Sequence, residues 1–196
     1  MINLFAMILA LCSVWITPVS TEVMAGANST IEIEANFPCE LHTLVLHVNY
    51  DVNNITINDI HRGNIIIPED AMCIIENTAD SYCTVGIVCP NEPISGTGTL
   101  LSIDYTVSKN CTEPQVITVV IDECFYAPLG GGCTPINCEG GSSTINIVRP
   151  TTSAALRVLR AILGLLDTPE WADVNNDGVV NSIDVLDIIR IIHSMY

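Results

Sequence analysis

Positively charged residues are scarce in this sequence of 196 residues, which holds 6 Lys and Arg against 22 Asp and Glu. The net charge of −16 at pH 7 repels phosphate backbones, so we expect no nucleic-acid partner. The imbalance is concentrated in residues 28–148, where 15 acidic residues stand against two basic ones, Arg62 and Lys109. Residues 149–196 hold 6 acidic and 4 basic residues and are much closer to neutral.

Motifs for catalysis are also missing. The chain has no Gly-x-Ser-x-Gly elbow, no phosphate-binding loop ending in Gly-Lys-Ser/Thr, and no His-x-x-x-His or Cys-x-x-Cys pair. Its adjacent acids, Glu69-Asp70 and Asp122-Glu123, do not suit glycoside hydrolysis, because sequence neighbours on a strand point to opposite faces. The sequence therefore predicts a protein that is not an enzyme.

The N-terminus contains no Lys or Arg, but it carries an almost unbroken apolar run over residues 4–16. Small residues follow at Ala25-Gly26-Ala27, which predicts a secretory signal peptide over residues 1–27 with cleavage after Ala27. An uncleaved membrane anchor is the alternative, although the run is short for a span of about 20 residues. No later segment is long enough to cross a bilayer, so we expect a secreted protein, extracellular or at the cell surface.

Cysteine usage agrees with export. Nine cysteines are present, and removal of Cys12 with the leader leaves eight. An even set in an exported domain indicates four disulfide bonds, whose pairing stays open among about 105 arrangements. The eight residues are Cys39, Cys73, Cys83, Cys89, Cys111, Cys124, Cys133 and Cys138.

A twelve-residue stretch near the C-terminus, residues 173–184, has the spacing of an EF-hand calcium loop. Gly178 stands at the sixth position, where such a loop turns sharply. Oxygen donors fall at positions 1, 3, 5, 7 (a backbone carbonyl), 9 and 12, and these suit a hard cation. The predicted ligands of one Ca²⁺ ion are Asp173, Asn175, Asp177, Val179, Asn181 and Asp184. The alternative is a turn rich in Asp and Asn that only caps the next helix.

Apolar helical repeats flank this loop. A shift of thirty residues superimposes Leu156 on Leu186, Leu159 on Ile189 and Arg160 on Arg190. We expect two helices whose apolar sides face one another, with Trp171 as a packing anchor between them. On one helix these residues are Leu156, Leu159, Ile162 and Leu163, and on the other Val185, Leu186, Ile188, Ile189 and Ile192.

Period-two segments separated by Gly, Pro and Asn recur through residues 28–148 and predict a β-sandwich. The expected strands cover residues 30–35, 44–50, 54–60, 64–67, 83–88, 99–107, 115–122 and 144–148. The β pattern gives way to the helical pattern near Arg149-Pro150, which predicts a domain boundary there.

The calcium loop and its following helix resemble a dockerin, because Asp184 occupies position 12 where a sensor EF-hand has Glu. Dockerins are calcium-dependent modules that bind cohesin domains. The resemblance implies that Ser182, Ile183 and Arg190 contact the partner. Dockerins usually have two such loops, and the first copy here is degenerate, with Ala154 in the place of Asp184. We therefore expect one calcium ion and not two.

The preceding β region resembles a cohesin, the receptor for dockerins. The likeness rests on the strand that ends in Tyr50-Asp51 with the segment that follows it, on the Gly96-x-Gly98-x-Leu100 strand, and on the closing strand at residues 143–147. The segment from Cys124 to Gly141 has no counterpart in that family, and no cohesin contact residue is transferred.

Together these features predict a mainly β protein: a signal peptide (1–27), a cohesin-like β-sandwich of jelly-roll type (28–148) and a small α-helical dockerin-like calcium module (149–196). The expected function is non-catalytic assembly with cohesin- or dockerin-bearing proteins, in a polysaccharide-degrading or cell-surface complex. One alternative is a carbohydrate-binding module on the sandwich, although aromatics make up only 5% of the chain. The other is a structural surface protein whose calcium module only stabilises the chain.

Overall fold

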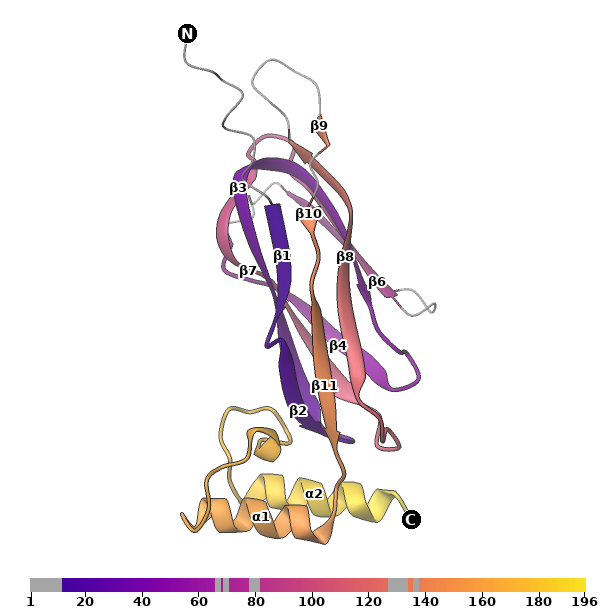
Figure 1. Ribbon diagram of the computed structural model, residues 1–196, viewed down its shortest axis with the longest axis vertical. Coiled ribbons are helices and arrows are strands. Elements are labelled where there is room, and N and C mark those ends of the chain that lie inside the picture. The colour runs from indigo at the N-terminus through magenta and orange to yellow at the C-terminus, as the bar shows by residue number, and fades with distance from the viewer. Residues whose placement is uncertain (1–11, 66–67, 69–70, 78–81, 127–133, 136–137) are drawn as a thin grey trace.

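The computed structural model describes residues 12–65, 68, 71–77, 82–126, 134–135 and 138–196. An elongated β-sandwich forms the body, and two helices lie side by side across one end of it (Figure 1). The strands are β1 (Cys12–Thr17), β2 (Ser20–Met24), β3 (Asn28–Asn49), β4 (Ile55–Arg62), β5 (Met72–Asn77), β6 (Tyr82–Val88), β7 (Ile94–Val107), β8 (Gln115–Tyr126), β9 (Thr134–Pro135), β10 (Cys138–Glu139) and β11 (Ser142–Val148). The helices are α1 (Thr152–Ile162), the 3₁₀ turn η2 (Glu170–Ala172) and α2 (Ser182–Ser194).

The long strand β3 joins the two layers of the sandwich. Its first half pairs with β1 and β7, and β7 pairs in turn with β4. Its second half pairs with β6 and β8, which extend that layer to β5 on one side and to β11 and β2 on the other. The register shifts between Phe37 and Leu41, and such an irregularity lets one strand bend from one layer into the other.

The core lies between these layers. Along β6 the side chains of Cys83, Val85 and Ile87 are buried, while those between them are not, as a half-buried strand requires. Tyr105 and Phe37 are the largest fully buried side chains. Burial raises the pKa of the Tyr105 hydroxyl above its usual value, so Tyr105 stays neutral in the core.

The predicted signal peptide is at odds with this structure. Residues 13–17 of β1 pair with β3, and β2 runs parallel to β11 over all five of its residues. Val14, Ile16 and Met24 are buried in the common core. Cleavage after Ala27 would remove two strands of the sandwich, β1 and β2. The bounds 1–27 and 28–148 stay predictions. Among the described residues, no helix is both long and apolar enough to span a bilayer.

Most predicted strands are confirmed, since those expected at 30–35, 44–50, 54–60, 83–88, 99–107, 115–122 and 144–148 fall in β3, β4, β6, β7, β8 and β11. The segment 64–67 is the exception: Asn64 and Ile65 form a bend, and residues 66–67 lie outside the described part. The side chain of Asn64 instead accepts a hydrogen bond from the Thr99 backbone N–H (2.7 Å). Strands β1, β2 and β5 and the two-residue strands β9 and β10 were not predicted.

The disulfide prediction is not confirmed. No disulfide joins any two of the cysteines whose side chains the structure describes, and Cys73, Cys83 and Cys111 are free thiols. Cys12 belongs to β1, so the count of eight that favoured four bridges does not apply to the folded body. Burial raises the pKa of the Cys83 thiol, which keeps it protonated and unreactive. The side chains of Cys39, Cys133 and Cys138 lie outside the described part of the structure.

Candidate functional site

The loop between η2 and α2 contains five of the six predicted calcium ligands, and the sixth, Asp184, lies in the first turn of α2. Trp171 in η2 is buried before the loop begins, and the guanidinium of Arg157 lies 5.4 Å from its ring centroid. The backbone reverses at Asn176 (φ 59°) and Gly178 (φ 83°), two left-handed positions that Asn and Gly adopt most readily. The glycine that was expected to turn the loop therefore does so.

Asp184 closes the loop. Its carboxylate is fully buried and accepts hydrogen bonds from the backbone N–H groups of Val174 (2.9 Å) and Asn181 (2.8 Å). The side chain of Asn181 in turn accepts from the Ile183 N–H (2.8 Å), and reciprocal bonds between Asn181 and Asp184 form a capping box at the start of α2. Asp184 thus connects Val174, the second residue of the twelve-residue stretch, to Asn181, the ninth, and it also caps α2.

The other predicted ligands are linked in a similar way. Asp173 accepts from the N–H groups of Asp177 (3.1 Å) and Gly178 (2.8 Å). Asp177 accepts from the Val179 N–H (2.9 Å) and from the Asn175 side chain (3.1 Å). The Val179 carbonyl accepts from the Asn181 side chain (3.0 Å).

The donor set suits a hard cation, because it consists of three carboxylates, two side-chain amides and a backbone carbonyl. Among the described residues, however, no three His, Cys, Asp or Glu side chains gather into a metal-binding cluster. The carboxylates of Asp173, Asp177 and Asp184 are occupied by N–H donors. A carboxylate oxygen that holds one N–H keeps a second lone pair, so these bonds do not exclude an ion.

The predicted partner residues all lie on the solvent side of α2. Ser182 and Ile183 are exposed in its first turn, and Arg190 is exposed near its end. Arg190 pairs with Asp187 three residues earlier (2.6 Å). Ile183 and Arg190 are two helical turns apart and share one side of the helix.

The expected packing of the two helices is wrong in most of its residues. Only Ile188 among the nine is fully buried, and it packs in the same core as Ala154, Ala155 and Val158 of α1. The larger residues point outward, with Leu156 45% and Leu186 51% exposed. Small side chains let the helix backbones approach closely, and this leaves the large apolar residues on the outside. We define the helix face as the exposed apolar residues along one side of each helix together with the arginine beside each of them. Its residues are Leu156, Leu159, Arg160 and Leu163 from the first helix and Ile183, Leu186, Ile189 and Arg190 from the second.

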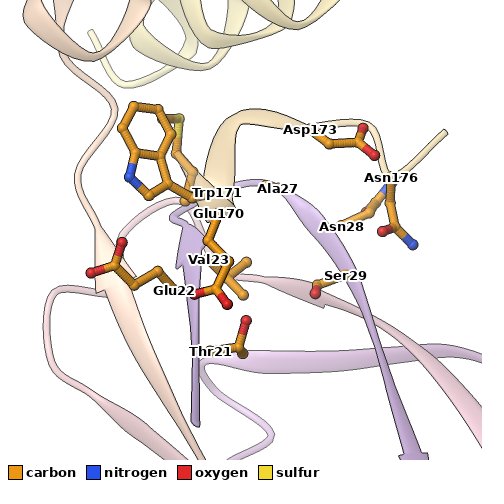
Figure 2. A pocket seen from close by; sticks show the side chains of 11 residues that line it. Thr21, Glu22, Val23, Ala27, Asn28, Ser29, Glu170, Trp171, Asp173 and Asn176 are labelled. Carbon is orange, nitrogen blue, oxygen red and sulfur yellow. The ribbon is translucent and has the colours of Figure 1, made fainter. Parts of the chain in front are cut away.

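The helical module is joined to the sandwich at the calcium loop. The Asn176 side chain donates to the Thr30 hydroxyl (2.8 Å), and Thr30 donates to Asp104 (2.6 Å). At the C-terminal end of α2, the Lys109 ammonium donates to the Ser194 carbonyl (2.9 Å). A polar pocket of about 140 Å³ lies at this joint, between β2, β3, η2 and the loop (Figure 2).

Gly26 provides a direct test of this joint. Its φ of +88° is left-handed, and a Cβ atom there would lie 2.9 Å from the Ile191 side chain of α2. Gly26→Ala should loosen the module by about 1–2 kcal/mol, visible as faster hydrogen exchange in α2. Gly96→Ala is the matched control, because Gly96 also has a positive φ (+107°) but open space beside it. Equal exchange rates in α2 for both variants would contradict a packed joint.

The sandwich carries a second candidate surface on the outer side of β5, β6, β3 and β8. His47 lies at its centre, bonded to the Thr84 hydroxyl (2.9 Å), 3.4 Å from the Asp122 carboxylate and edge-on to Tyr82. Register places Glu76 opposite Thr84 on the same side. We call this surface the sheet face; its exposed residues are Met72, Ile74, Glu76, Val88, Val116, Val120 and Asp122. Sequence reasoning missed it, because no contact residue was transferred.

Aromatic platforms for sugars are few among the described residues. Trp171, Tyr50 and Tyr105 are buried, whereas Trp15, once placed in the leader, is 37% exposed on β1, Tyr82 on β6 is half-buried and Tyr196 at the C-terminus is exposed. These rings belong to three separate parts of the chain, and the polysaccharide alternative receives no support from the side chains that the structure describes.

No protein-family model matches this sequence. No curated protein matches it either. Solved structures do match: a non-cellulosomal cohesin from the archaeon Archaeoglobus fulgidus has a TM-score of 0.54 at 19% identity, covering 71% of this chain and 92% of that one. The seventh ScaB type I cohesin of Pseudobacteroides cellulosolvens gives 0.58 at 16% identity, with 71% and 93% covered. A type I cohesin–dockerin complex of Clostridium thermocellum gives 0.56 at 13%, with 70% and 95% covered. The fold of the sandwich is therefore that of cohesin modules, as the sequence pattern indicated.

Proposed function

We propose that this chain is an exported, non-catalytic assembly protein whose sandwich receives a dockerin-bearing partner. The observation that carries the proposal is the cohesin fold itself, since cohesins with this fold are found in complexes with dockerins. The exposed apolar side chains of the sheet face support it, because an apolar patch of this kind on a folded domain marks an interaction site. Neither partner recognition nor export needs any catalytic group.

The helical module is the second half of the proposal: a dockerin-like unit that binds one Ca²⁺ ion and presents Ser182, Ile183 and Arg190 to a cohesin-bearing partner. The six loop residues from Asp173 to Asp184 would hold the ion, which supplies positive charge among three carboxylates. The hydrogen bonds of Asp184 hold both ends of the loop and the start of α2 together. The conformation of the loop therefore sets the position of Ile183, the residue proposed to contact the partner.

Asp173→Ala combined with Asp177→Ala should weaken calcium binding by a factor of a hundred or more, because it removes two of the three charged ligands. Isothermal titration calorimetry of the full chain measures this. The matched control is Asp167→Ala with Asp187→Ala, which removes the same charge from the same module outside the ligand set. Unchanged calcium affinity in the loop variant would refute the ligand assignment.

Partner binding is tested with the immobilised full chain and the secreted fraction of the host, with calcium or with chelator, followed by mass spectrometry. We expect dockerin-bearing chains on the sandwich, and calcium-dependent recovery of cohesin-bearing chains through the helical module. The variant with Asp173→Ala and Asp177→Ala should lose the cohesin-bearing chains and keep the dockerin-bearing chains. If neither class binds in calcium, the assembly function is wrong.

A further inference from the structure

The helix face lacks a partner within the chain. Leu156, Leu159 and Leu163 follow one side of α1, and Ile183, Leu186 and Ile189 follow α2, all between 40% and 65% exposed. Arg160 and Arg190 lie beside these stripes and are exposed. Six large apolar residues on two packed helices, with two arginines beside them, are costly to leave in water, and this composition favours an apolar partner surface that carries negative charge.

The sheet face has the complementary composition. Its apolar residues are Met72, Ile74, Val88, Val116 and Val120, and its charged residues are the acids Glu76 and Asp122. No Lys or Arg lies on it among the described residues of the sandwich. Arg62 is in β4 of the other layer, and the Lys109 ammonium is bonded to the Ser194 carbonyl. The helix face, which is apolar with arginines, is therefore complementary to the sheet face, which is apolar with acids, and both are on the same molecule.

The two surfaces of one molecule cannot meet. Only three residues connect the end of β11 at Val148 to the start of α1 at Thr152, a reach of about 10 Å. The module is also held across the end of the sandwich by the bonds from Asn176 and Lys109 and by the contact of Ile191 with Gly26 (Figure 1). Contact between a helix face and a sheet face therefore requires a second molecule.

We propose that the chain assembles with itself, the helix face of one copy docking on the sheet face of the next. This rests on the proposed function and names the partner of both surfaces as a second copy of this chain. Because the two surfaces differ, the contact is head-to-tail, and each bound pair leaves one helix face and one sheet face free. Assembly then proceeds to rings or filaments instead of stopping at a dimer.

Sedimentation velocity on the full chain with calcium tests the inference, and we expect species that grow with concentration beyond the dimer. The helix variant, Leu156→Glu with Leu186→Glu, and the sheet variant, Ile74→Glu with Val120→Glu, should each be monomeric, their affinity reduced about thirtyfold or more. An equal mixture of the two should form one-to-one dimers and nothing larger, since each pair regains a single intact contact. Dimers of the sheet variant alone would mean a helix-to-helix contact and overturn the inference.

Charge reversal gives a second test at exposed positions that leave the core untouched. Arg160→Glu with Arg190→Glu, and separately Glu76→Lys with Asp122→Lys, should each weaken self-association about tenfold or more at low salt. Mixing the two reversed proteins should restore it. Failure of this restoration would overturn the pairing of these two surfaces. A wild-type chain that stays monomeric yet still retains dockerin-bearing partners would overturn self-assembly and leave the proposed function standing.

Discussion

Removal of residues 1–27 is expected to abolish folding of the sandwich. The truncation deletes β1 and β2, uncovering one edge of β3 and one edge of β11. It also removes the buried side chains of Val14, Ile16, Val23 and Met24. At about 1.5–3 kcal/mol for each, their loss is comparable to the whole stability of a typical domain, about 5–15 kcal/mol. Far-UV circular dichroism and the soluble yield of a chain starting at Asn28 measure the effect.

Point variants separate the role of the strand from the effect of shortening the chain. Ile16→Ala should lower the free energy of unfolding by about 2–5 kcal/mol, because it leaves a cavity in the core. Val19→Ala is the control, since Val19 lies between the same two strands and is mostly exposed; it should change stability by less than about 0.5 kcal/mol. A folded secreted protein whose N-terminal residue is Asn28 would contradict the assignment of β1 and β2 to the sandwich.

Strands β1 and β2 were missed because an apolar pattern alone does not identify a strand. An apolar run near the N-terminus satisfies both a leader and a buried strand, and the periodicity of residues 4–16 does not separate the two. The alternation of buried and exposed residues in β1 becomes visible only with its partner strand in place. By contrast, β6 alternates in the sequence itself and was predicted close to its observed limits, whereas for β7 only the end at Val107 was predicted and the strand begins five residues earlier, at Ile94.

The helices illustrate a different limit. Both were located correctly from their apolar repeats, and Thr151 caps α1 by accepting a hydrogen bond from the Ala154 N–H. Their packing was not predicted, because the sequence pattern does not say whether large or small residues meet. Ala154 and Ala155 fill the contact, and Leu156 is left for solvent or for a partner. Ala154, which aligns with Asp184 after a shift of thirty residues, is one of the small residues that pack at this contact.

The candidate site was located by spacing, but its attachment was not. Loop positions follow from local chemistry, in which Gly178 and the oxygen-bearing residues recur at fixed intervals. The bond from Asn176 to Thr30 joins residues 146 positions apart, and no local signal predicts it. Because the loop packs on the first residues of β3, order in the loop and order at that end of the sandwich are coupled.

Asp184 distinguishes the structural role of the loop from its proposed role as a calcium site. Asp184→Ala should destabilise the helical module by about 3 kcal/mol or more even in chelator, because two backbone N–H groups lose a buried charged acceptor. Asp177→Ala removes an exposed carboxylate and should cost about 1 kcal/mol or less in chelator. In calcium both variants should also lose the stabilisation that ion binding gives the wild type.

Hydrogen exchange in α2, measured with calcium and with chelator, reports both effects at once. For Asp177→Ala the protection of α2 in chelator should stay within about fivefold of the wild type, and the gain on adding calcium should disappear. For Asp184→Ala protection should be low in both conditions, because the capping box at Asn181 is lost with the ligand. Equal protection for the two variants in chelator would show that the buried carboxylate does not hold the loop. If the ligand assignment is right, α2 has two sources of order, the internal bonds of Asp184 and the ion, and only the second can respond to calcium concentration.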